Sequence, residues 1–390
     1  MESIIHRELR NFLTKKRCTL LGVGPMSVNC VNASIELSNL HEIPLMLIAS
    51  RRQIDSSEFG GGYVNNWSTN EFSEYVTQRD KGKQIILARD HGGPWQNNIE
   101  IDKKFNLDQA MSSAKMSYKS DIDSNFKLLH IDPSIDIHDN PSVDQIIERI
   151  FELYAYCIDY AKKNNKEIIF EIGTEEQSGS TNTQEELDYT LSKINNFCNK
   201  EKIIKPSFVV IQCGTKVMER RNIGSFDMPI RVKNELPPEI QLPKMIQICD
   251  KHNIFMKEHN TDYISDEALN WHPRLGIHAA NVAPEFGVSE TLSLIKILRL
   301  NHLDTILNGM LEISFNSGKW KKWMLPNTDA SDEEKSIIAC HYVFSNSNFI
   351  ELKKQAEKEL IRKHINLDQI LTDDIKKSIM RYLINFRLIN

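Results

Sequence analysis

Short apolar runs recur through the first 282 residues, and each ends abruptly in polar, glycine or proline residues. The run at 84–88, for example, is followed at once by Arg89, Asp90, His91 and two glycines. Strands of a buried parallel sheet are apolar on both faces, so each run predicts one such strand. The predicted strands are residues 19–23, 44–49, 84–88, 127–131, 167–172, 207–212, 254–258 and 275–282.

Segments with helical spacing of apolar residues lie between most of these runs. Alternating strands and helices are typical of βαβ units and a parallel sheet. Eight repeats predict a (β/α)8 TIM barrel, a fold of about 250 residues. An open doubly wound sheet is the alternative, but L-G-V-G-P-M after the first strand is too degenerate for the glycine fingerprint of such sheets. The predicted helices are residues 3–17, 28–40, 69–79, 107–118, 143–163, 184–199 and 243–252.

The pattern changes after residue 288, where strand signals end and helical spacing continues. We therefore expect two parts, a barrel at 1–288 and a helical C-terminal extension at 289–390 that packs on the barrel or on a partner subunit. The helices expected in the extension are residues 291–300, 303–311, 333–344, 348–364 and 372–386.

The net charge, the cysteine spacing and the length of the apolar runs argue against several classes of protein. The net charge of −5 argues against a general nucleic-acid binder. The seven cysteines form no C-x-x-C pair, which favours reduced thiols in a cytoplasmic protein. No apolar run reaches the length of a membrane span, and the N-terminus lacks the apolar core of a signal peptide.

Ionisable side chains gather just past the predicted strands, on what would be one face of a barrel. Two of them, His91 and His259, together with a carboxylate (Glu171 or Glu175), predict a three-ligand metal site with an open position, as zinc enzymes use. The strand-end residues are Arg51, Gln53, Asp90, His91, His130, Asp132, Glu171, Glu175, Lys216, Glu258, His259, Asp262, Asn281 and Glu285.

Two polar, glycine-bearing loops follow the second and fifth predicted strands. The first, 51–68, contains F-G-G-G-Y, and the second, 175–183, reads E-E-Q-S-G-S-T-N-T. Their position makes both candidate lids over the site. A third long segment, 228–243, is proline-rich and is a candidate arm or interface loop.

Several motifs carry a resemblance to the tagatose-bisphosphate aldolase family. R-D-H-G-G-P-W at 89–95 is similar to its D-H-x-G-P segment, and E-H-N-T-D-Y at 258–263 is similar to its E-H-S-T-D-Y. The resemblance is to proteins described as the non-catalytic subunit of that aldolase. Wider relatives are the zinc-dependent class II fructose-bisphosphate aldolases, which are (β/α)8 barrels. Further segments resemble the family. They are Gln53 together with residues 59–63, and residues 130–132, 172–175, 320–323 and 381–383.

The resemblance implies roles for particular residues. Asp90 would move a proton, and His91 and His259 would bind Zn²⁺ or another divalent metal. The third zinc histidine of class II aldolases is missing, since the matching segment reads Gly214-Thr215-Lys216-Val217. Glu175 is the expected substitute ligand, and Glu171 is the second choice.

Substrate contacts follow from the same comparison and from the chemistry of the reaction. Cleaving a carbon–carbon bond beside a carbonyl needs an electron sink, which a divalent metal provides, and proton transfers. Glu176, in a candidate lid, is the expected second proton donor, and Arg51 or Arg52 with nearby backbone amides could hold a phosphate. The expected substrate-binding residues are Arg51, Gln53, Asp132, Lys216, Asn260, Thr261, Asp262 and Asn281.

The sequence thus predicts an aldehyde-lyase that acts on a phosphorylated ketose, with dihydroxyacetone phosphate and an aldehyde as partners in the reaction. Two alternatives stay open. Lys216 could form a Schiff base in a metal-free aldolase, or the chain could be a non-catalytic companion of a catalytic aldolase subunit. We expect a homo-oligomer that binds neither nucleic acid nor membrane.

Overall fold

Eight parallel strands close into a barrel in the computed structural model, which describes residues 3–174, 183–227 and 237–389. Around the barrel the order is β1-β10-β9-β6-β5-β4-β3-β2. Because β1 pairs with both β2 and β10, the sheet has no free edge and the open-sheet alternative is excluded. The strands are β1 Leu20–Val23, β2 Leu45–Ser50, β3 Ile85–Gly92, β4 Leu128–Ile131, β5 Ile169–Ile172, β6 Phe208–Val210, β9 Phe255–Glu258 and β10 Ala279–Val282.

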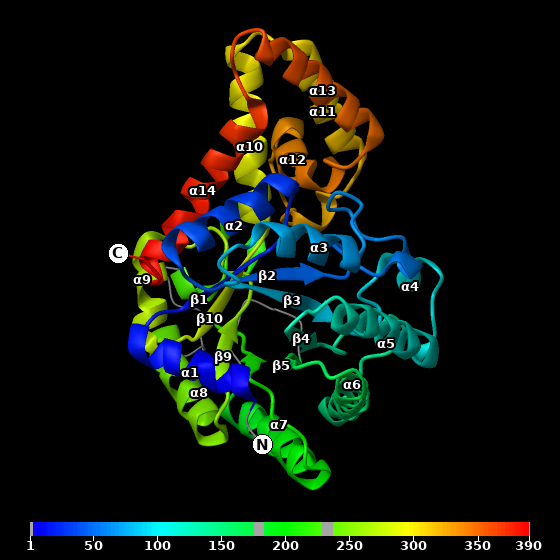
Figure 1. Ribbon diagram of the computed structural model, residues 1–390, viewed down its shortest axis with the longest axis vertical. Helices are drawn as coiled ribbons and strands as arrows, with labels where there is room; N and C mark the ends of the chain where they lie inside the picture. Colours follow the sequence, from blue (N-terminus) through cyan, green and yellow to red (C-terminus); the bar gives the residue numbers. More distant parts are fainter. Residues whose placement is uncertain (1–2, 175–182, 228–236, 390) are drawn as a thin grey trace.

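Helices surround the barrel and begin where the sequence provides caps (Figure 1). Ser68, Asn106, Ser142 and Thr183 each form a capping box at the first turn of the helix that follows. The helices are α1 Ile4–Lys16, α2 Val28–His41, α3 Thr69–Arg79, α4 Asn98–Asp102, α5 Leu107–Asp123, α6 Val143–Lys163, α7 Gln184–Glu201, α8 Pro238–His252, α9 Asp266–Leu275 and α10 Pro284–Leu300.

Four short elements were not predicted. Helix α4 has only five residues, and α9 contains Pro273, a residue that argues against a helix in a sequence pattern. Two-residue strands β7 (Val217–Met218) and β8 (Arg221–Asn222) form a small antiparallel hairpin after β6. Such short pieces are too brief for periodicity to detect.

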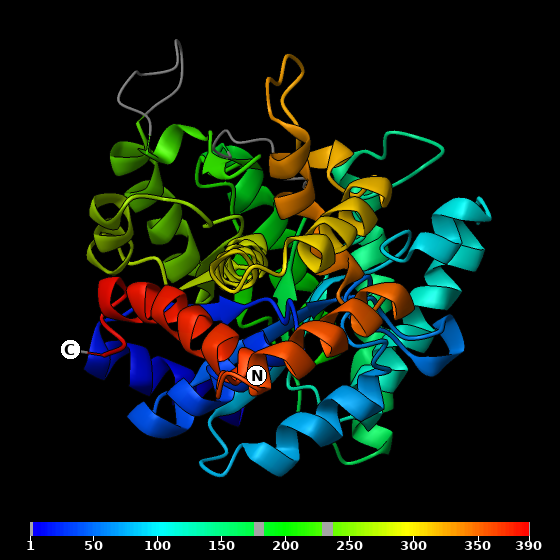
Figure 2. The same cartoon turned by 90° about the horizontal axis from the view of Figure 1, so that it is seen from above.

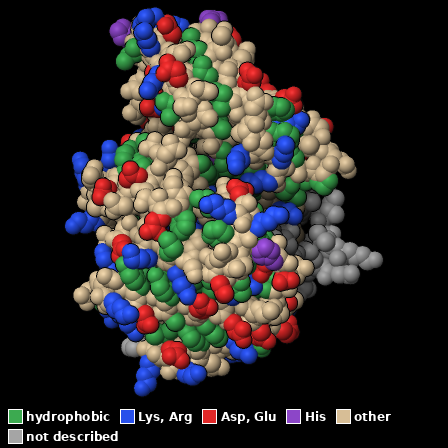
Figure 3. Space-filling view, turned by 90° about the vertical axis from the view of Figure 1, so that its right-hand side faces the viewer, with side chains coloured by type: hydrophobic (Ala, Val, Ile, Leu, Met, Phe, Trp, Pro, Cys, Tyr) green, Lys and Arg blue, Asp and Glu red, His purple; other side chains and the backbone are tan. Residues whose placement is uncertain are grey.

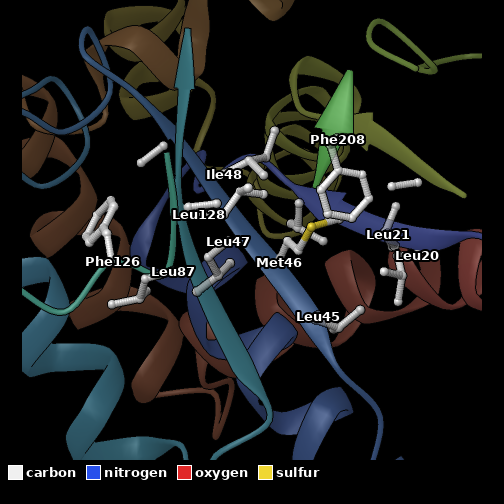
Figure 4. Close-up of a cluster of buried hydrophobic side chains, with 14 of the residues drawn as sticks. Leu20, Leu21, Leu45, Met46, Leu47, Ile48, Leu87, Phe126, Leu128 and Phe208 are labelled. Atoms are coloured by element: carbon white, nitrogen blue, oxygen red, sulfur yellow. The ribbon is translucent and has the colours of Figure 1, made fainter. Parts of the chain in front are cut away.

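The core explains why the apolar runs are continuous. Leu45, Met46, Leu47 and Ile48 follow one another along β2, and each is at most 2% exposed, because both faces of the strand are covered. Figure 4 shows these side chains on both sides of β2, among others from β1, β3, β4 and β6.

The C-terminal helices form a lobe, and the last of them runs along the outside of the barrel (Figures 1 and 2). An apolar cluster of its own holds much of the lobe together, whereas Ile375, Ile379 and Tyr382 of α14 belong to the barrel's core cluster. The predicted division at residue 288 falls within α10, and it stays a prediction. The further elements are α11 Asp304–Asn316, η3 Lys321–Trp323, α12 Asp332–Ala339, η4 Cys340–Val343, α13 Ser347–Ile361 and α14 Leu367–Asn385.

The first candidate lid is a compact loop in the structure. Tyr63 N donates to Arg52 O at 3.1 Å and Gly62 N donates to Trp67 O at 3.1 Å. A Cβ at Gly62 would lie 2.0 Å from Gln53 O, so this close backbone approach requires glycine. Most of the second candidate lid, 175–182, and of the third long segment, 228–236, lies outside the described residues.

Every helix of the described ranges is too short or too polar to cross a membrane.

Candidate active site

A layer of polar side chains fills the carboxyl end of the barrel. The parallel register pairs His130 of β4 with Glu171 of β5, so both side chains lie on the same face of the sheet. Glu171 Oε1 lies 2.7 Å from His259 Nε2 and 3.8 Å from His130 Nδ1. Glu171 Oε2 accepts a hydrogen bond from Lys257 Nζ at 2.5 Å. The Glu171 carboxylate of β5 therefore contacts side chains of β4 and of the β9 segment at the centre of the layer.

An irregularity at the end of β3 brings two consecutive residues to this layer. The register between β3 and β4 shifts between Arg89 and Gly92, and His91 has φ 43°. Arg89 points outward to Asp121. Asp90 reaches the centre, where it accepts a hydrogen bond from Asn281 Nδ2 at 3.2 Å. In a regular strand the next side chain would point away from Asp90, but the bulge turns His91 to the same side.

Three histidines surround the Asp90 carboxylate. Its oxygens lie 3.9 Å from His91 Nε2, 4.0 Å from His130 Nδ1 and 3.8 Å from His259 Nε2. One nitrogen from each ring lies within 4.8 Å of the others. The His130 and His259 side chains are buried, whereas that of His91 is 39% exposed and marks the open side of the cluster.

The histidines differ in protonation. Burial lowers the pKa of His130 and of His259 to about 3, so both imidazoles are neutral and able to ligate a metal. For His91, desolvation works against the charged form, but Asp90 and the hydrogen bond to Asp132 raise the pKa to about 9. Asp132 is itself held ionised, since the hydrogen bond from His91 lowers its pKa despite burial.

The donor set fits a divalent metal ion. His91 Nδ1 lies 2.7 Å from Asp132 Oδ2, which leaves the other ring nitrogen free to face an ion. Such a carboxylate behind a histidine is the usual support of a metal ligand. His130 Nδ1, the ring nitrogen nearest Asp90 and Glu171, accepts a hydrogen bond from His91 N at 3.1 Å, whereas His130 Nε2 is buried without a hydrogen-bond partner in the described structure. Three imidazoles with an open side match the ligands of a catalytic zinc.

Not all predicted ligands lie in this cluster. Glu175, the expected third ligand, and Glu176, the expected proton donor, lie outside the described residues. Glu171, the second choice for the third ligand, contacts His259 as described above. His130 takes the third position in the histidine cluster, although the sequence analysis had not named it as a ligand. The sequence did place His130 among the strand-end residues and in the segment 130–132 that resembles the family, and its register with Glu171 puts both side chains on the same face.

Arg51 and Gln53, two predicted substrate contacts, are buried in the wall of the barrel. Arg51 Nε lies 2.9 Å from Asp55 Oδ2, and Arg51 Nη1 lies 2.5 Å from Glu100 Oε1. Gln53 Oε1 accepts a hydrogen bond from Ser50 N at 2.8 Å. These side chains hold the loop after β2 rather than opening onto the histidine cluster.

The predicted contacts after β9 also stabilise local structure. Thr261 Oγ1 donates to the buried Glu258 carboxylate at 2.8 Å. Asp262 Oδ1 accepts hydrogen bonds from Ala283 N at 3.0 Å and Glu285 N at 2.8 Å, which caps α10. Three of the motif's six residues, Glu258, Thr261 and Asp262, thus stabilise the turn that carries His259.

Asn260 and Lys216 lie beside the small hairpin. Asn260 O and Lys216 N both bond to the Asn222 side chain, at 2.8 Å and 3.1 Å. Lys257, which the sequence analysis did not single out, is the lysine that contacts the central carboxylate Glu171. As part of a mostly apolar strand, it carries no signal of its own in the sequence.

Comparison with known proteins identifies the family of the chain. The family model described as D-tagatose-1,6-bisphosphate aldolase subunit GatZ/KbaZ-like matches residues 12–291. The chain belongs to this family. The match covers the whole barrel and ends within α10, so the resemblance drawn from the motifs is confirmed.

Solved structures share the fold of this GatZ/KbaZ-like chain at low sequence identity. A probable tagatose 6-phosphate kinase from Sinorhizobium meliloti 1021 is 15% identical with a TM-score of 0.70, over 94% of this chain and 100% of that one. The fructuronate-tagaturonate epimerase UxaE from Cohnella laeviribosi is 10% identical with a TM-score of 0.60, over 98% and 86%. The fructose-bisphosphate aldolase of Campylobacter jejuni is 11% identical with a TM-score of 0.52, over 100% and 99%. The chain therefore has an aldolase-type barrel fold.

Proposed function

We propose that this protein is a metal-dependent, class II-like aldolase that makes or cleaves a carbon–carbon bond in a phosphorylated ketose. The observation that carries the proposal is the cluster of His91, His130 and His259 around the Asp90 carboxylate. The family description, which names an aldolase subunit for a sugar bisphosphate, supports the same reaction class.

The three histidines would hold Zn²⁺ or another divalent ion, and the bound ion would polarise the substrate carbonyl and stabilise the enediolate charge. His130 replaces Glu175 and Glu171 as the preferred third ligand in this proposal. His130 and His259 are neutral nitrogen donors and His91 would become one on losing its proton, a set that suits zinc, whereas Glu171 is already engaged with Lys257.

Asp90 is the base that moves the hydroxyl proton at the bond being cleaved. It lies next to the metal ligands, and Asn281 orients it through one hydrogen bond. The inward position of Asn281 depends on Gly22 of β1, since a Cβ there would lie 2.2 Å from Asn281 Oδ1. Asn281 can therefore hold Asp90 and contact substrate from the same position.

Asp132 orients His91, and Ser134 and Gln96 fix Asp132 in turn. Ser134 Oγ donates to Asp132 Oδ1 at 2.5 Å, and Gln96 Nε2 donates to Asp132 Oδ2 at 3.3 Å. Asp132 is accordingly proposed as a support of the site. Glu176 stays in the proposal as a second proton donor, and Lys216 and Asn260 stay as substrate contacts.

A second candidate is the non-catalytic companion of a catalytic aldolase subunit, and the word subunit in the family description favours it. A third is a Schiff-base aldolase that uses Lys216. The proposal places the protein in the cytoplasm as a homo-oligomer. Purified protein alone, assayed with dihydroxyacetone phosphate and a panel of aldehydes, separates the first two candidates, and borohydride trapping tests the third.

The deciding experiment is metal analysis of the purified protein and of His91→Ala, His130→Ala and His259→Ala. We expect about one equivalent of zinc in the wild type, and loss of that zinc in each variant with the fold retained. His364→Asn is the control, because His364 is exposed and its positive φ of 58° suits asparagine. Wild-type protein that binds no metal after zinc is added back would refute the metal-dependent reading.

A further inference from the structure

A cavity of about 320 Å³ lies at the junction of the barrel and the C-terminal lobe. Its walls come from the start of α2, from residues 63–65 of the loop after β2, and from α10, α13 and α14. Figure 3 shows the surface hollowed where the lobe meets the barrel. The described lining includes none of the three clustered histidines, so the cavity is distinct from the candidate active site.

Much of the wall is apolar and tightly packed. Met26, Leu294, Phe349 and Leu371 line the cavity, and each is at most 3% exposed. Phe344 also lines it, and the centre of its ring lies 5.4 Å from that of Phe349. An apolar wall that carries a few polar groups is typical of a site for a small organic molecule.

A buried carboxylate, that of Glu290 on α10, is the polar group of the wall that lacks a counter-charge. Glu290 is 3% exposed and accepts hydrogen bonds from Ser27 Oγ and, at 2.8 Å, from Asn29 Nδ2. Both donors are neutral, and Glu290 forms no ion pair within the described part of the chain. The other buried carboxylates there, Asp262 apart, each pair with an arginine, a lysine or a histidine.

The two lysines of the wall do not neutralise Glu290. Lys353 Nζ lies 2.5 Å from Asp368 Oδ1 and 3.3 Å from Glu357 Oε1, and these two carboxylates also line the cavity. Lys354 is exposed, so solvent screens its charge. Burial of a carboxylate without a counter-charge costs free energy, and burial raises the pKa of Glu290 accordingly. A cation bound in the cavity would reduce that cost.

We propose that this cavity binds a small organic ammonium ion, a compound with a primary amine and an apolar group. The ammonium would donate to the Glu290 oxygens, each of which accepts one hydrogen bond in the structure and has room for another. The apolar group would lie against Phe344 and Phe349. An anion is disfavoured, because Ser27 caps α2 and the Glu290 carboxylate already occupies the helix N-terminus where an anion would bind.

A ligand in this cavity would touch the barrel and the lobe at the same time. Val64 of the loop after β2 and Leu371 of α14 both line it. Ser345 of the lobe and Tyr63 of the loop line it as well, and Ser345 Oγ donates to Tyr63 O at 2.8 Å. A compound that binds only the folded protein stabilises it, so a bound amine should raise the unfolding temperature.

Binding of hexylamine and phenethylamine to the full-length protein tests the assignment, measured by calorimetry and by thermal unfolding at neutral pH. Hexanol and phenylethanol are the matched neutral probes, and phenylpropionate is an anionic one. We expect the better of the two amines to bind at least about tenfold more tightly than its alcohol, as one charge-assisted hydrogen bond provides, and phenylpropionate to bind more weakly than either.

Three variants assign the binding to this cavity. Glu290→Gln keeps the shape of the side chain and removes its charge, so the amine should lose its advantage over the alcohol. Glu312→Gln is the control, since Glu312 is exposed on α11 and is absent from the described lining. Ile350→Phe narrows the cavity, leaves each carboxylate in place and should weaken binding of amine and alcohol alike.

Equal binding of amine and alcohol to the wild type would overturn the inference. An amine preference that persists in Glu290→Gln, or amine binding that Ile350→Phe leaves unchanged, would overturn it as well. The inference does not depend on the proposed aldolase reaction, because the histidine cluster and its metal analysis involve other residues.

Discussion

His91 shows how two neighbouring carboxylates change one imidazole. Asp90 favours its charged form, and so does Asp132, which also receives its hydrogen bond, whereas the buried His130 and His259 stay neutral. The metal-free site therefore carries a proton on the one histidine that is partly exposed. A metal ion must displace that proton to bind, so metal binding and protonation compete at His91.

This competition predicts that the stabilising contribution of His91 in the metal-free protein falls as the pH rises, whereas the affinity for zinc increases. Without metal, His91 has a folded pKa of about 9 against an ordinary value of 6.5. Its contribution to stability is then complete below pH 6.5 and is lost as the pH rises through 9. We expect the difference in unfolding free energy between wild type and His91→Gln, from urea titrations, to be larger at pH 6 than at pH 9.5.

With zinc, the pH dependence has the opposite direction: zinc binding strengthens as the pH rises, because the competing proton leaves His91. Affinity for zinc, measured by competition with a chelator, should rise between pH 6.5 and 9. A zinc affinity that is flat over this range, together with a constant stability difference, would contradict the assignment of the raised pKa to His91.

At the scale of elements, the end of β3 is the feature that builds the site. The bulge places Asp90 and His91 on the same side, and it brings Gly92 against the neighbouring strand. A Cβ at Gly92 would lie 2.5 Å from Tyr118 Oη and 2.7 Å from His130 O. Tyr118 Oη donates to His130 O at 2.8 Å, so the same crowded point also fixes His130.

Gly92→Ala is therefore expected to damage the metal site more than the fold. Relief of the clash must move β3 away from His130, at a cost of about 1–3 kcal/mol of unfolding free energy, with a loss of zinc affinity. Chemical denaturation and zinc titration of the same preparation measure both effects.

Gly60→Ala provides the matched control. A Cβ at Gly60 meets no atom within 4 Å, but φ of +79° strains an alanine, so this variant loses stability without a change near the histidines. Equal losses of zinc affinity in the two variants would show that general destabilisation, and not the bulge, is responsible.

At the scale of the whole molecule, helix α14 connects the C-terminal lobe to the barrel's core cluster. Helix α14 packs along α2 and α10, and Thr19 N at the start of β1 donates to Phe386 O at 3.0 Å. Arg381 and Tyr382 bond to the Glu285 carboxylate at the start of α10. Helix α14 thus holds the start of α10 and, through Phe386, the segment that leads into β1.

Two isoleucines on α14 test this integration. Ile379 is fully buried in the barrel's core cluster, whereas Ile384 on the same helix is 50% exposed. We expect Ile379→Ala to lower the unfolding free energy of the whole protein by about 2–4 kcal/mol, in one cooperative transition, and Ile384→Ala to lower it by less than about 1 kcal/mol.

Calorimetry and circular dichroism of the full chain measure that transition. Separate unfolding of the lobe, with the barrel transition unchanged in Ile379→Ala, would mean that α14 is not part of the barrel's cooperative unit.

The local pattern of apolar and polar residues was sufficient to predict the barrel architecture. Each apolar run overlaps one strand, because strands covered on both faces are mostly apolar, although β2 and β3 extend past the predicted ends to Ser50 and Gly92. Helices α3 and α6 begin and end at the predicted residues, since caps and periodicity are local signals. The collection of Asp90, His91, Asp132, His259 and Asn281 at one face followed from the fold class, as strand ends converge in any such barrel.

Other features depend on packing between distant segments, which no local pattern records. The inward turn of His91 requires the bulge against β4, and the role of His130 follows from its register with Glu171. Arg51 looks like a phosphate ligand in the sequence, but in the fold it forms ion pairs with Asp55 and Glu100. The sequence by itself determined which chemical groups reach the open face, and the tertiary structure decided which of them meet, because contact between distant segments is set by strand register and packing.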